Sequence, residues 1–259
     1  MNIELIFKLL LENWQIVVFF FLIAVSYSSV GFGGGSSYLA VLALTSFAFV
    51  EIRATALLCN ILVVSGNVFI FQQQKKHDYK KILPLILFSI PCAFLGGLIR
   101  ISETFFFIIL GFTLLFAAFT MWISKKIVSE ENKEEIINYK KSSFFGGIIG
   151  FLSGLVGIGG GIFLAPLLHL TNWDTPKKIA ATASLFILVN SIAGLVGQYS
   201  NPDFYINWNI TSILLFVVLI GGILGNLLRN KIFNPLLLKR TTAFLIAIIS
   251  LRILLKHLF

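Results

Sequence analysis

The sequence GIGGG at residues 157–161, with its near twin GFGGG at residues 31–35, decides how the rest of the chain is organised. Each stretch places four glycines in five positions inside otherwise continuous apolar sequence. Because each interior glycine destabilises a helix by about 1 kcal/mol, a plain spanning helix is not expected at either place. In hydrocarbon, a broken helix is tolerated only where it is buried in protein or faces a watery cavity. Two such breaks in equivalent places indicate the substrate site of a transporter.

Composition places almost the whole chain within or beside a bilayer. Of its 259 residues, 58% are hydrophobic and 12% are charged, whereas a soluble domain carries about 25% charged residues. The formal net charge of +9 comes from Lys and Arg in short connectors between apolar runs, so it indicates membrane topology and not nucleic-acid binding. We therefore predict an all-α polytopic membrane protein that has the lipid bilayer as a partner and no nucleic acid.

The apolar runs on either side of the first glycine stretch are short. Residues 14–30 and 36–50 would each form about 24 Å of helix, against a hydrocarbon core of about 30 Å. We favour a hairpin that enters the membrane from one side and turns at depth on the glycines. Two short, tilted spans are the alternative.

The chain divides into two similar halves joined by a charged connector. Residues 1–123 and 144–259 each carry about five apolar segments, and residues 124–143 hold five lysines and four glutamates. The glycine stretches stand 126 positions apart (157 minus 31), and the ATA sequence at 54–56 recurs at 181–183, an offset of 127. Such self-similarity indicates an internal repeat. An odd number of segments reverses the chain, so we expect two inverted repeats whose glycine stretches meet near the midplane.

The basic loops give the orientation. Four basic segments can all be cytoplasmic only if the first hairpin enters from outside and the second from inside; they are the loop at 75–81, the connector, the pair Lys177 and Lys178, and the pair Arg229 and Lys231. Both termini then face outward. The ionisable residues at segment ends are interpreted as snorkelling to the interface; they are Glu51, Arg53, Arg100 and Arg229.

The segments after the two glycine stretches would begin helices at membrane depth. Their first N–H groups lack intrahelical partners and carry the positive end of the helix dipole, and the glycines let a ligand approach the backbone. Two such N-termini from opposite sides would form an electropositive pocket for a small anion. In the alternative interpretation the glycines are packing notches. That interpretation fits Gly146, Gly150 and Gly154, at four-residue spacing, better than three consecutive glycines.

We predict a substrate site shared by both halves. Ser36 and Ser37 would add hydroxyl donors on the first side only, because Ile162 and Phe163 stand opposite, so the pocket would be lopsided. Polar side chains in the third segment of each half should face the interior, where interhelical hydrogen bonding is the alternative to substrate contact. The predicted substrate-binding residues are Gly33, Gly34, Gly35, Ser36, Ser37, Thr55, Asn60, Gly159, Gly160, Gly161, Thr182 and Asn190.

The sequence contains no catalytic or metal-binding constellation. There is no Ser/His/Asp arrangement, no Cys/His metal spacing and no Walker sequence. Cys59 and Cys92 lie in apolar runs and are interpreted as packing residues. His169 is either a proton acceptor or an interfacial, hydrogen-bonded histidine. We expect no enzyme, metal or cofactor, and the coupling ion stays open because no embedded carboxylate pair is present.

The sequence GLVGIGGGIFLAPLL at residues 154–168, followed by AATASL at 180–185, resembles the signature of the sulfite exporter TauE/SafE family, also called the toluene sulfonate uptake permease family. Residues 31–35 with RATA at 53–56 look like the same signature, with Ala40 where the second copy has Pro166. The resemblance implies a multi-pass carrier of the bacterial inner membrane for small sulfur-containing or organic anions such as sulfite, sulfonates or sulfoacetate, often in the export direction.

Three other functions compete with a secondary transporter. A passive anion channel fits the same pocket. A membrane scaffold without substrate has no need for two helix breaks in register, and an integral membrane enzyme would need clustered His, Asp or Glu at membrane depth. A homodimer contact through the Phe-rich spans stays open, although 27 phenylalanines in a chain that faces lipid need no such explanation.

Overall fold

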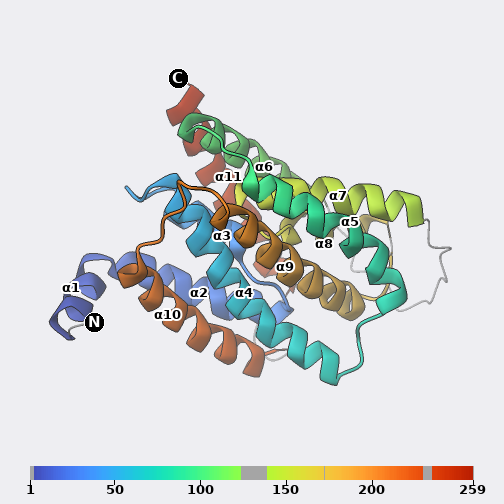
Figure 1. The fold of residues 1–259 in the computed structure, drawn as a ribbon. Helices are drawn as coiled ribbons and strands as arrows, with labels where there is room; N and C mark the ends of the chain where they lie inside the picture. Colours follow the sequence, from blue (N-terminus) through green and yellow to red (C-terminus); the bar gives the residue numbers. More distant parts are fainter. Residues whose placement is uncertain (1–2, 124–138, 172, 230–234, 259) are drawn as a thin grey trace.

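The computed structural model describes residues 3–123, 139–171, 173–229 and 235–258, and this part of the chain consists of helices joined by turns and loops, with no strand (Figure 1). The helices are α1 (Ile3–Glu12), α2 (Trp14–Val30), α3 (Gly35–Leu42), α4 (Phe49–Gln73), α5 (Tyr79–Leu98), α6 (Glu103–Ile123), α7 (Tyr139–Val156), α8 (Gly161–Leu170), α9 (Pro176–Tyr199), α10 (Trp208–Leu227) and α11 (Pro235–Leu258).

Five of these helices, α4, α5, α6, α9 and α10, are long and apolar enough to cross a membrane. α2 and residues 142–156 of α7 are shorter apolar helices. Large apolar side chains such as Phe69, Leu87 and Phe216 are exposed on the outside of the bundle, which suits contact with lipid and not with water. The prediction of an all-α polytopic membrane protein is confirmed.

Each glycine stretch forms a non-helical turn between two helices. α2 ends at Val30, and Gly31 and Gly34 adopt left-handed φ values of 90° and 87° before α3. In the second half, Gly157, Gly159 and Gly160 have φ values of 81° to 85° between α7 and α8. A residue with a Cβ pays a steric cost in this region, so a run of glycines is what permits the turn.

The helices after the breaks are short and fold back. α3 has 8 residues and α8 has 10, about 12 and 15 Å at 1.5 Å per residue, so neither spans a bilayer. The ring of Tyr38 in α3 stacks on Phe20 in α2 with 4.7 Å between centroids. This geometry fits a hairpin and not two tilted spans.

The first hairpin differs from the sequence expectation at its far end. The apolar run extends to Val50, but α3 stops at Leu42 and α4 already begins at Phe49. The Thr45 hydroxyl donates to the carbonyl of Leu42 and accepts from the N–H of Phe47, and such local bonds compete with helix continuation. At the connector, residues 139–143 form the start of α7, and residues 124–138 lie outside the described residues.

The two halves pack with approximate two-fold symmetry. When α2–α6 are matched to α7–α11, the pair α2 and α10 corresponds to α7 and α5, and α4 and α6 pack against their own equivalents, α9 and α11. The symmetry holds for single residues. A methyl group added at Gly31 would lie 3.4 Å from Ala180, and one added at Gly157 would lie 3.2 Å from Arg53. The two contacts are equivalent in the repeat, because Gly31 corresponds to Gly157 (31 plus 126) and Arg53 corresponds to Ala180 (53 plus 127).

The equivalent helices α4 and α9 run antiparallel. Phe71, near the end of α4, packs on Ala180 and Ala181 at the start of α9, whereas Arg53, at the start of α4, shares a cavity with Gln198 at the end of α9. Both helices are long enough to span, so equivalent parts of the two halves point in opposite directions. This is the arrangement of an inverted repeat.

Glycines at four-residue spacing bring backbones together across the halves. Methyl groups at Gly146, Gly150 and Gly154 on α7 would lie 2.3, 2.4 and 1.9 Å from backbone carbonyl oxygens of α5. The packing interpretation of these three glycines is confirmed, and it explains how α5 and α7 approach so closely.

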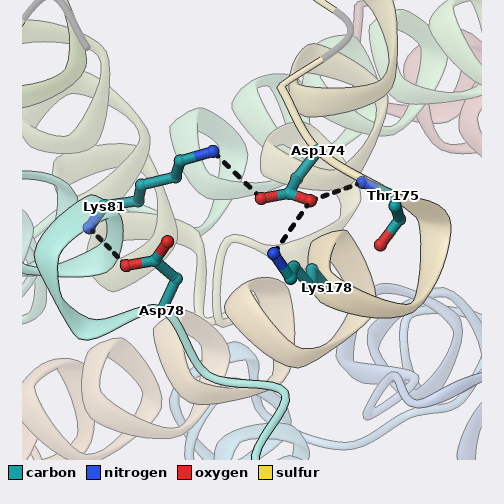
Figure 2. A network of polar contacts seen from close by, with 5 residues as sticks. All are labelled: Asp78, Lys81, Asp174, Thr175 and Lys178. Carbon is teal, nitrogen blue, oxygen red and sulfur yellow. Dashed lines mark hydrogen bonds and ion pairs between the residues drawn. The ribbon is translucent and has the colours of Figure 1, made fainter. Parts of the chain in front are cut away.

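The charged loops sort to the two ends of the bundle. Lys81, at the start of α5, and Lys178, at the start of α9, both contact Asp174 (Figure 2), so two of the basic segments predicted to be cytoplasmic lie at the same end. At the other end Arg100 lies 3.8 Å from Asp203. Helix α1 and the end of α11 lie on the left in Figure 1, away from the turn between α4 and α5, which agrees with the expectation that the two termini share a face.

Candidate substrate site

Asn60 on α4 joins the two glycine breaks. Its Oδ1 accepts a hydrogen bond from the N–H of Gly35 at 3.2 Å. Its Nδ2 donates to the carbonyl oxygen of Ile158 at 3.3 Å and to Ser191 Oγ at 3.0 Å. One buried amide therefore contacts the first break, the second break and α9. The glycine stretches of the two halves meet at this side chain, as the inverted-repeat prediction requires.

The approach of the two breaks depends on glycine. A methyl group at Gly35 would lie 2.4 Å from the carbonyl oxygen of Ile158, and one at Gly159 would lie 2.2 Å from Asn60 Nδ2. Real Cβ atoms do not come this close to other heavy atoms. The two breaks could not keep this separation with any other residue at these positions.

Several backbone amides of the breaks make no hydrogen bond within the described residues. The first turn of a helix leaves its N–H groups without the usual intrahelical partners. At the starts of α3 and α8, Gly35 N–H donates to Asn60, and the N–H groups of Ser37 and Phe163 donate to the carbonyls of Gly34 and Gly160. Such amides carry the positive end of the helix dipole. The unpaired N–H groups are those of Gly33, Gly34, Ser36, Gly159, Gly160, Gly161 and Ile162.

A cavity of about 60 Å³ lies between the breaks. Within the described part of the chain, no Asp, Glu, Lys or Arg lines it. Its polar side combines the backbone of the first break with Ser36 and Asn60, and its apolar side comes mainly from the second half. The lining residues are Tyr27, Phe32, Gly33, Gly34, Gly35, Ser36, Asn60, Met121, Ile158, Gly161, Ile162, Ala165, Pro166 and Ile187.

The difference between the polar and the apolar side of the cavity comes from one pair of equivalent positions in the two repeats, Asn60 and Ile187. Gly33 faces Asn60 and Val64, whereas Gly159 faces Ile187 and Ser191 as well as Asn60. These positions are equivalent, since 60 plus 127 is 187 and 64 plus 127 is 191. The first half thus places an amide where the second places an isoleucine, so the cavity has one polar and one apolar side.

Arginines contact the carbonyl ends of the broken helices. Arg53 Nη2 donates to the carbonyl oxygen of Gly154 on α7 at 3.3 Å, and Arg229 Nη2 donates to that of Ser28 on α2 at 3.3 Å. Ser28 and Gly154 are repeat equivalents at the offset of 126. Helix C-termini carry a partial negative charge. The guanidinium groups of Arg53 and Arg229 therefore offset the negative ends of α7 and α2.

The snorkelling interpretation is wrong for two residues. Arg53 and Glu51 are only 4% and 5% exposed, because Arg53 is covered by α7 and by the ring of Phe106, whose centroid lies 6.0 Å from its guanidinium carbon. Arg229 is partly buried over Phe71 and also donates to Asn67 Oδ1 at 3.0 Å. The Arg100 side chain is 60% exposed, as an interfacial residue should be.

The structure brings together only part of the predicted site. Gly33, Gly34, Gly35, Ser36, Asn60 and Gly161 line the cavity, and Gly159 and Gly160 belong to the second break without lining it. Four predicted residues lie elsewhere. The hydroxyl of Ser37 bonds with Tyr27, Thr55 bonds with Thr211, and Asn190 donates to Ser89 and to the carbonyl of Phe186, while Thr182 is buried in α9 with its hydroxyl unpaired.

The sequence reasoning missed the apolar side of the cavity. Phe32, Met121, Pro166 and Ile187 line the cavity, and in the sequence they resemble any other apolar residue of a membrane helix. Of these four, only Phe32 and Pro166 carried a signal, since both lie within five residues of a glycine stretch. Among the described residues no group of His, Cys, Asp and Glu is arranged to hold a metal ion, and His169 does not line the cavity.

Inverted halves, five span-length helices and a buried break in each half define a polytopic membrane transporter, and the comparisons agree. The chain belongs to the sulfite exporter TauE/SafE family, whose profile matches residues 16–253.

Relatives cover most of the chain. A protein of Sinorhizobium fredii named "Probable membrane transporter protein y4hK" is 30% identical over an alignment of 253 residues that covers 94% of this chain and 98% of that protein. The "Probable membrane transporter protein MJ0441" of Methanocaldococcus jannaschii is 26% identical over 86% of each chain. The "Probable membrane transporter protein YunE" of Bacillus subtilis is 27% identical over 68% of this chain and 71% of its own. No solved structure matches the chain significantly.

Proposed function

We propose that this protein is a secondary transporter of small sulfur-containing or organic anions, such as sulfite, sulfonates or sulfoacetate, in the bacterial inner membrane. The observation that carries the proposal is the meeting of two helix breaks around a cavity with unpaired backbone amides. The family name and the names of the relatives support transport as the activity.

The electrostatics of the cavity favour an anion. Its lining, taken over the described residues, contains no carboxylate, while the starts of α3 and α8 contribute unpaired N–H groups and the positive ends of two helix dipoles. The carbonyl ends of α2 and α7 are contacted by Arg229 and Arg53. A cation in this place would meet N–H donors and no charged acceptor from this lining.

The size of the cavity favours a small ion with an apolar part. A water molecule needs about 10–15 Å³ of such volume, so 60 Å³ has room for only a few heavy atoms. A sulfonate would place its oxygens against Ser36 and the glycine amides, and its carbon against Ile187, Ile162 and Pro166. Sulfite would fill the polar side only.

The contacts between the halves favour a carrier over a channel. Asn60 bonds both breaks across the centre, and the Lys81–Asp174 pair joins α5 to the loop before α9 at one end. We expect access to the cavity from that end to involve the two halves moving apart there, which is the motion of alternating access between inverted repeats. A channel would need an open path through the same contacts.

Counterflow in liposomes tests the proposal. Purified protein is reconstituted into vesicles loaded with unlabelled sulfite, under anaerobic conditions, and the uptake of radiolabelled sulfite is followed; methanesulfonate, sulfoacetate, sulfate and acetate serve as competitors. A carrier shows saturable uptake that is accelerated by internal substrate. A flux that is linear in concentration and unaffected by internal anion supports a channel, and no flux of any of these anions refutes the proposal.

A further inference from the structure

We propose that a cavity beside Arg53 is a second anion-binding site, at the end of the bundle opposite the Lys81–Asp174 pair. The inference rests on the proposed function, because the site would hold the same anion on its path to the glycine cavity. The cavity measures about 30 Å³ and lies where the start of α4 meets the turns that follow α5 and α9. Its polar lining residues are Arg53, Arg100, Gln198, Asn201 and Asp203.

Arg53 is a buried cation without a counter-ion. It is 4% exposed, and no carboxylate of the described residues lies within 4.0 Å of its guanidinium nitrogens. Its Nη2 donates to the carbonyl of Gly154, and its buried Nε–H has no partner. Burying an unpaired charge is costly. A bound anion would supply a negative charge next to the Arg53 guanidinium and accept a hydrogen bond from its Nε–H.

Gln198 completes the polar side of this cavity. It is 3% exposed and shares the Gly154 carbonyl with Arg53, through Nε2 at 3.5 Å. Its Oε1 is buried and unpaired. The site thus offers a positive charge, a free N–H donor and a free acceptor. Hydrogensulfite presents the matching acceptor oxygens and a single O–H donor.

The charged residues at the rim of the cavity are expected to interact only weakly with an anion. The Arg100 side chain is 60% exposed and lies 3.8 Å from that of Asp203, which is 67% exposed. In water such a pair is weak. The strong interaction is therefore expected deeper, at Arg53, where water is excluded and charges act at a lower dielectric.

Arg53 and Asn60, which line the two cavities, lie on the same helix. Arg53 and Asn60 stand seven residues apart in α4, which is two helical turns on the same face and about 10 Å. Gly157, the first glycine of the second stretch, packs against Arg53, because a methyl group added at Gly157 would lie 3.2 Å from the Cα of Arg53. An anion released by Arg53 would meet the second glycine break next.

Calorimetric titration of the purified protein tests the site. Sulfite, methanesulfonate and acetate are titrated anaerobically into wild type and into the variants Arg53→Gln, Arg53→Lys and Gln198→Leu, with Arg252→Gln as an exposed arginine control on α11. Wild type should bind two equivalents of at least one anion. Arg53→Gln should weaken one equivalent at least about tenfold, as expected for a lost hydrogen bond to a charged group. Arg53→Lys should weaken it less, and Arg252→Gln should not change it.

The outcomes separate this site from the proposed function. If Arg53→Gln fails to give a monodisperse protein, Gln198→Leu and Arg53→Lys carry the test, and unchanged affinity and stoichiometry in both overturns the inference. A single equivalent that survives Arg53→Gln and disappears in Gly34→Leu also rejects the second site while the glycine cavity stands. No binding of any of the three anions to wild type overturns both proposals.

Discussion

The side-chain amide of Asn60 in the first half donates to the backbone carbonyl of Ile158 in the second half, 3.3 Å away, at the point where both halves are broken. The carbonyl belongs to the residue between two left-handed glycines. A fixed backbone conformation in one repeat is thus held by a side chain from the other. The two breaks therefore cannot separate without losing a hydrogen bond between the halves.

Replacing Asn60 by Asp should abolish anion binding while keeping the shape of the side chain. The change removes both Nδ2 donors, to Ile158 and Ser191, and places a negative charge in the cavity lining. Asn60→Ala should destabilise the fold by about 1–3 kcal/mol through the buried groups left unpaired and should reduce transport less than Asn60→Asp.

Counterflow and thermal unfolding in detergent measure these two effects. Ser65→Ala is the matched control on the same helix, because the Ser65 hydroxyl bonds to the carbonyl of Ile61 one turn earlier and not to another helix. Equal transport by Asn60→Asp and wild type would mean that the anion does not enter this cavity.

A methyl group at Gly35 should separate the two breaks. In Gly35→Ala the added carbon would lie 2.4 Å from the Ile158 carbonyl oxygen, and overpacking of this kind typically costs about 1–3 kcal/mol. The larger changes Gly34→Leu and Gly160→Leu also force a side chain into a left-handed conformation and should abolish transport.

Gly147→Ala supplies the comparison for this series, because its added methyl group would lie 3.5 Å from Cys92 Sγ, an ordinary contact. Transport rate and melting temperature are measured for all four variants. If Gly34→Leu inserts normally and transports at the wild-type rate, the backbone of the first break takes no part in binding.

The ion pair between Lys81 and Asp174 should stabilise the arrangement of the two halves in this structure. The two side chains are 19% and 8% exposed, their charged atoms are 3.0 Å apart, and they connect the halves at one end (Figure 2). A double-mutant cycle with Lys81→Ala and Asp174→Asn should give a coupling of about 0.5–3 kcal/mol in thermal stability. Lys178→Ala should have a smaller effect, since Lys178 is 42% exposed and 3.5 Å away.

The same pair predicts an acid dependence. Burial raises the pKa of Asp174, but the hydrogen bond from Thr175 N–H and the charges of Lys81 and Lys178 outweigh it and lower the pKa below the usual 3.8. A carboxyl with a lowered pKa in the folded state contributes stability above its unfolded pKa and loses it as the pH falls through the folded value. Wild type should lose this contribution as the pH falls below 3.8, and Asp174→Asn should not. Melting temperatures that fall in parallel for the two proteins would contradict the prediction.

Cysteine labelling tests the orientation of the bundle. In a background without Cys59 and Cys92, Lys76→Cys should react with an impermeant maleimide from the cytoplasmic side and Tyr205→Cys from outside, because Lys76 is half-buried in the loop between α4 and α5 and Tyr205 is exposed in the loop at the opposite end. Lys133→Cys, which should also react from the cytoplasmic side, lies outside the described residues. The reverse labelling pattern would invert the proposed topology without changing the fold.

The repeat, the two breaks and the membrane class follow from the sequence alone. Four glycines in five apolar positions cannot continue a helix without a large cost, and apolar runs of this length have no aqueous alternative. The offset of 126 to 127 residues between the two halves can be read directly from the order of residues in the sequence. The position of Lys81 and Lys178 at the same end of the bundle could also be inferred, because both lie in lysine-rich segments between apolar runs.

The composition of the site was decided only by the tertiary structure. Asn60, Thr55 and Asn190 are all polar residues in apolar helices, and nothing local distinguishes the amide that joins the two breaks from the hydroxyl that bonds Thr211 or the amide that bonds Ser89. Which partner a buried polar group finds depends on the register of helices far apart in the chain. The burial of Arg53 is of the same kind, since the carbonyl it contacts lies 101 residues away.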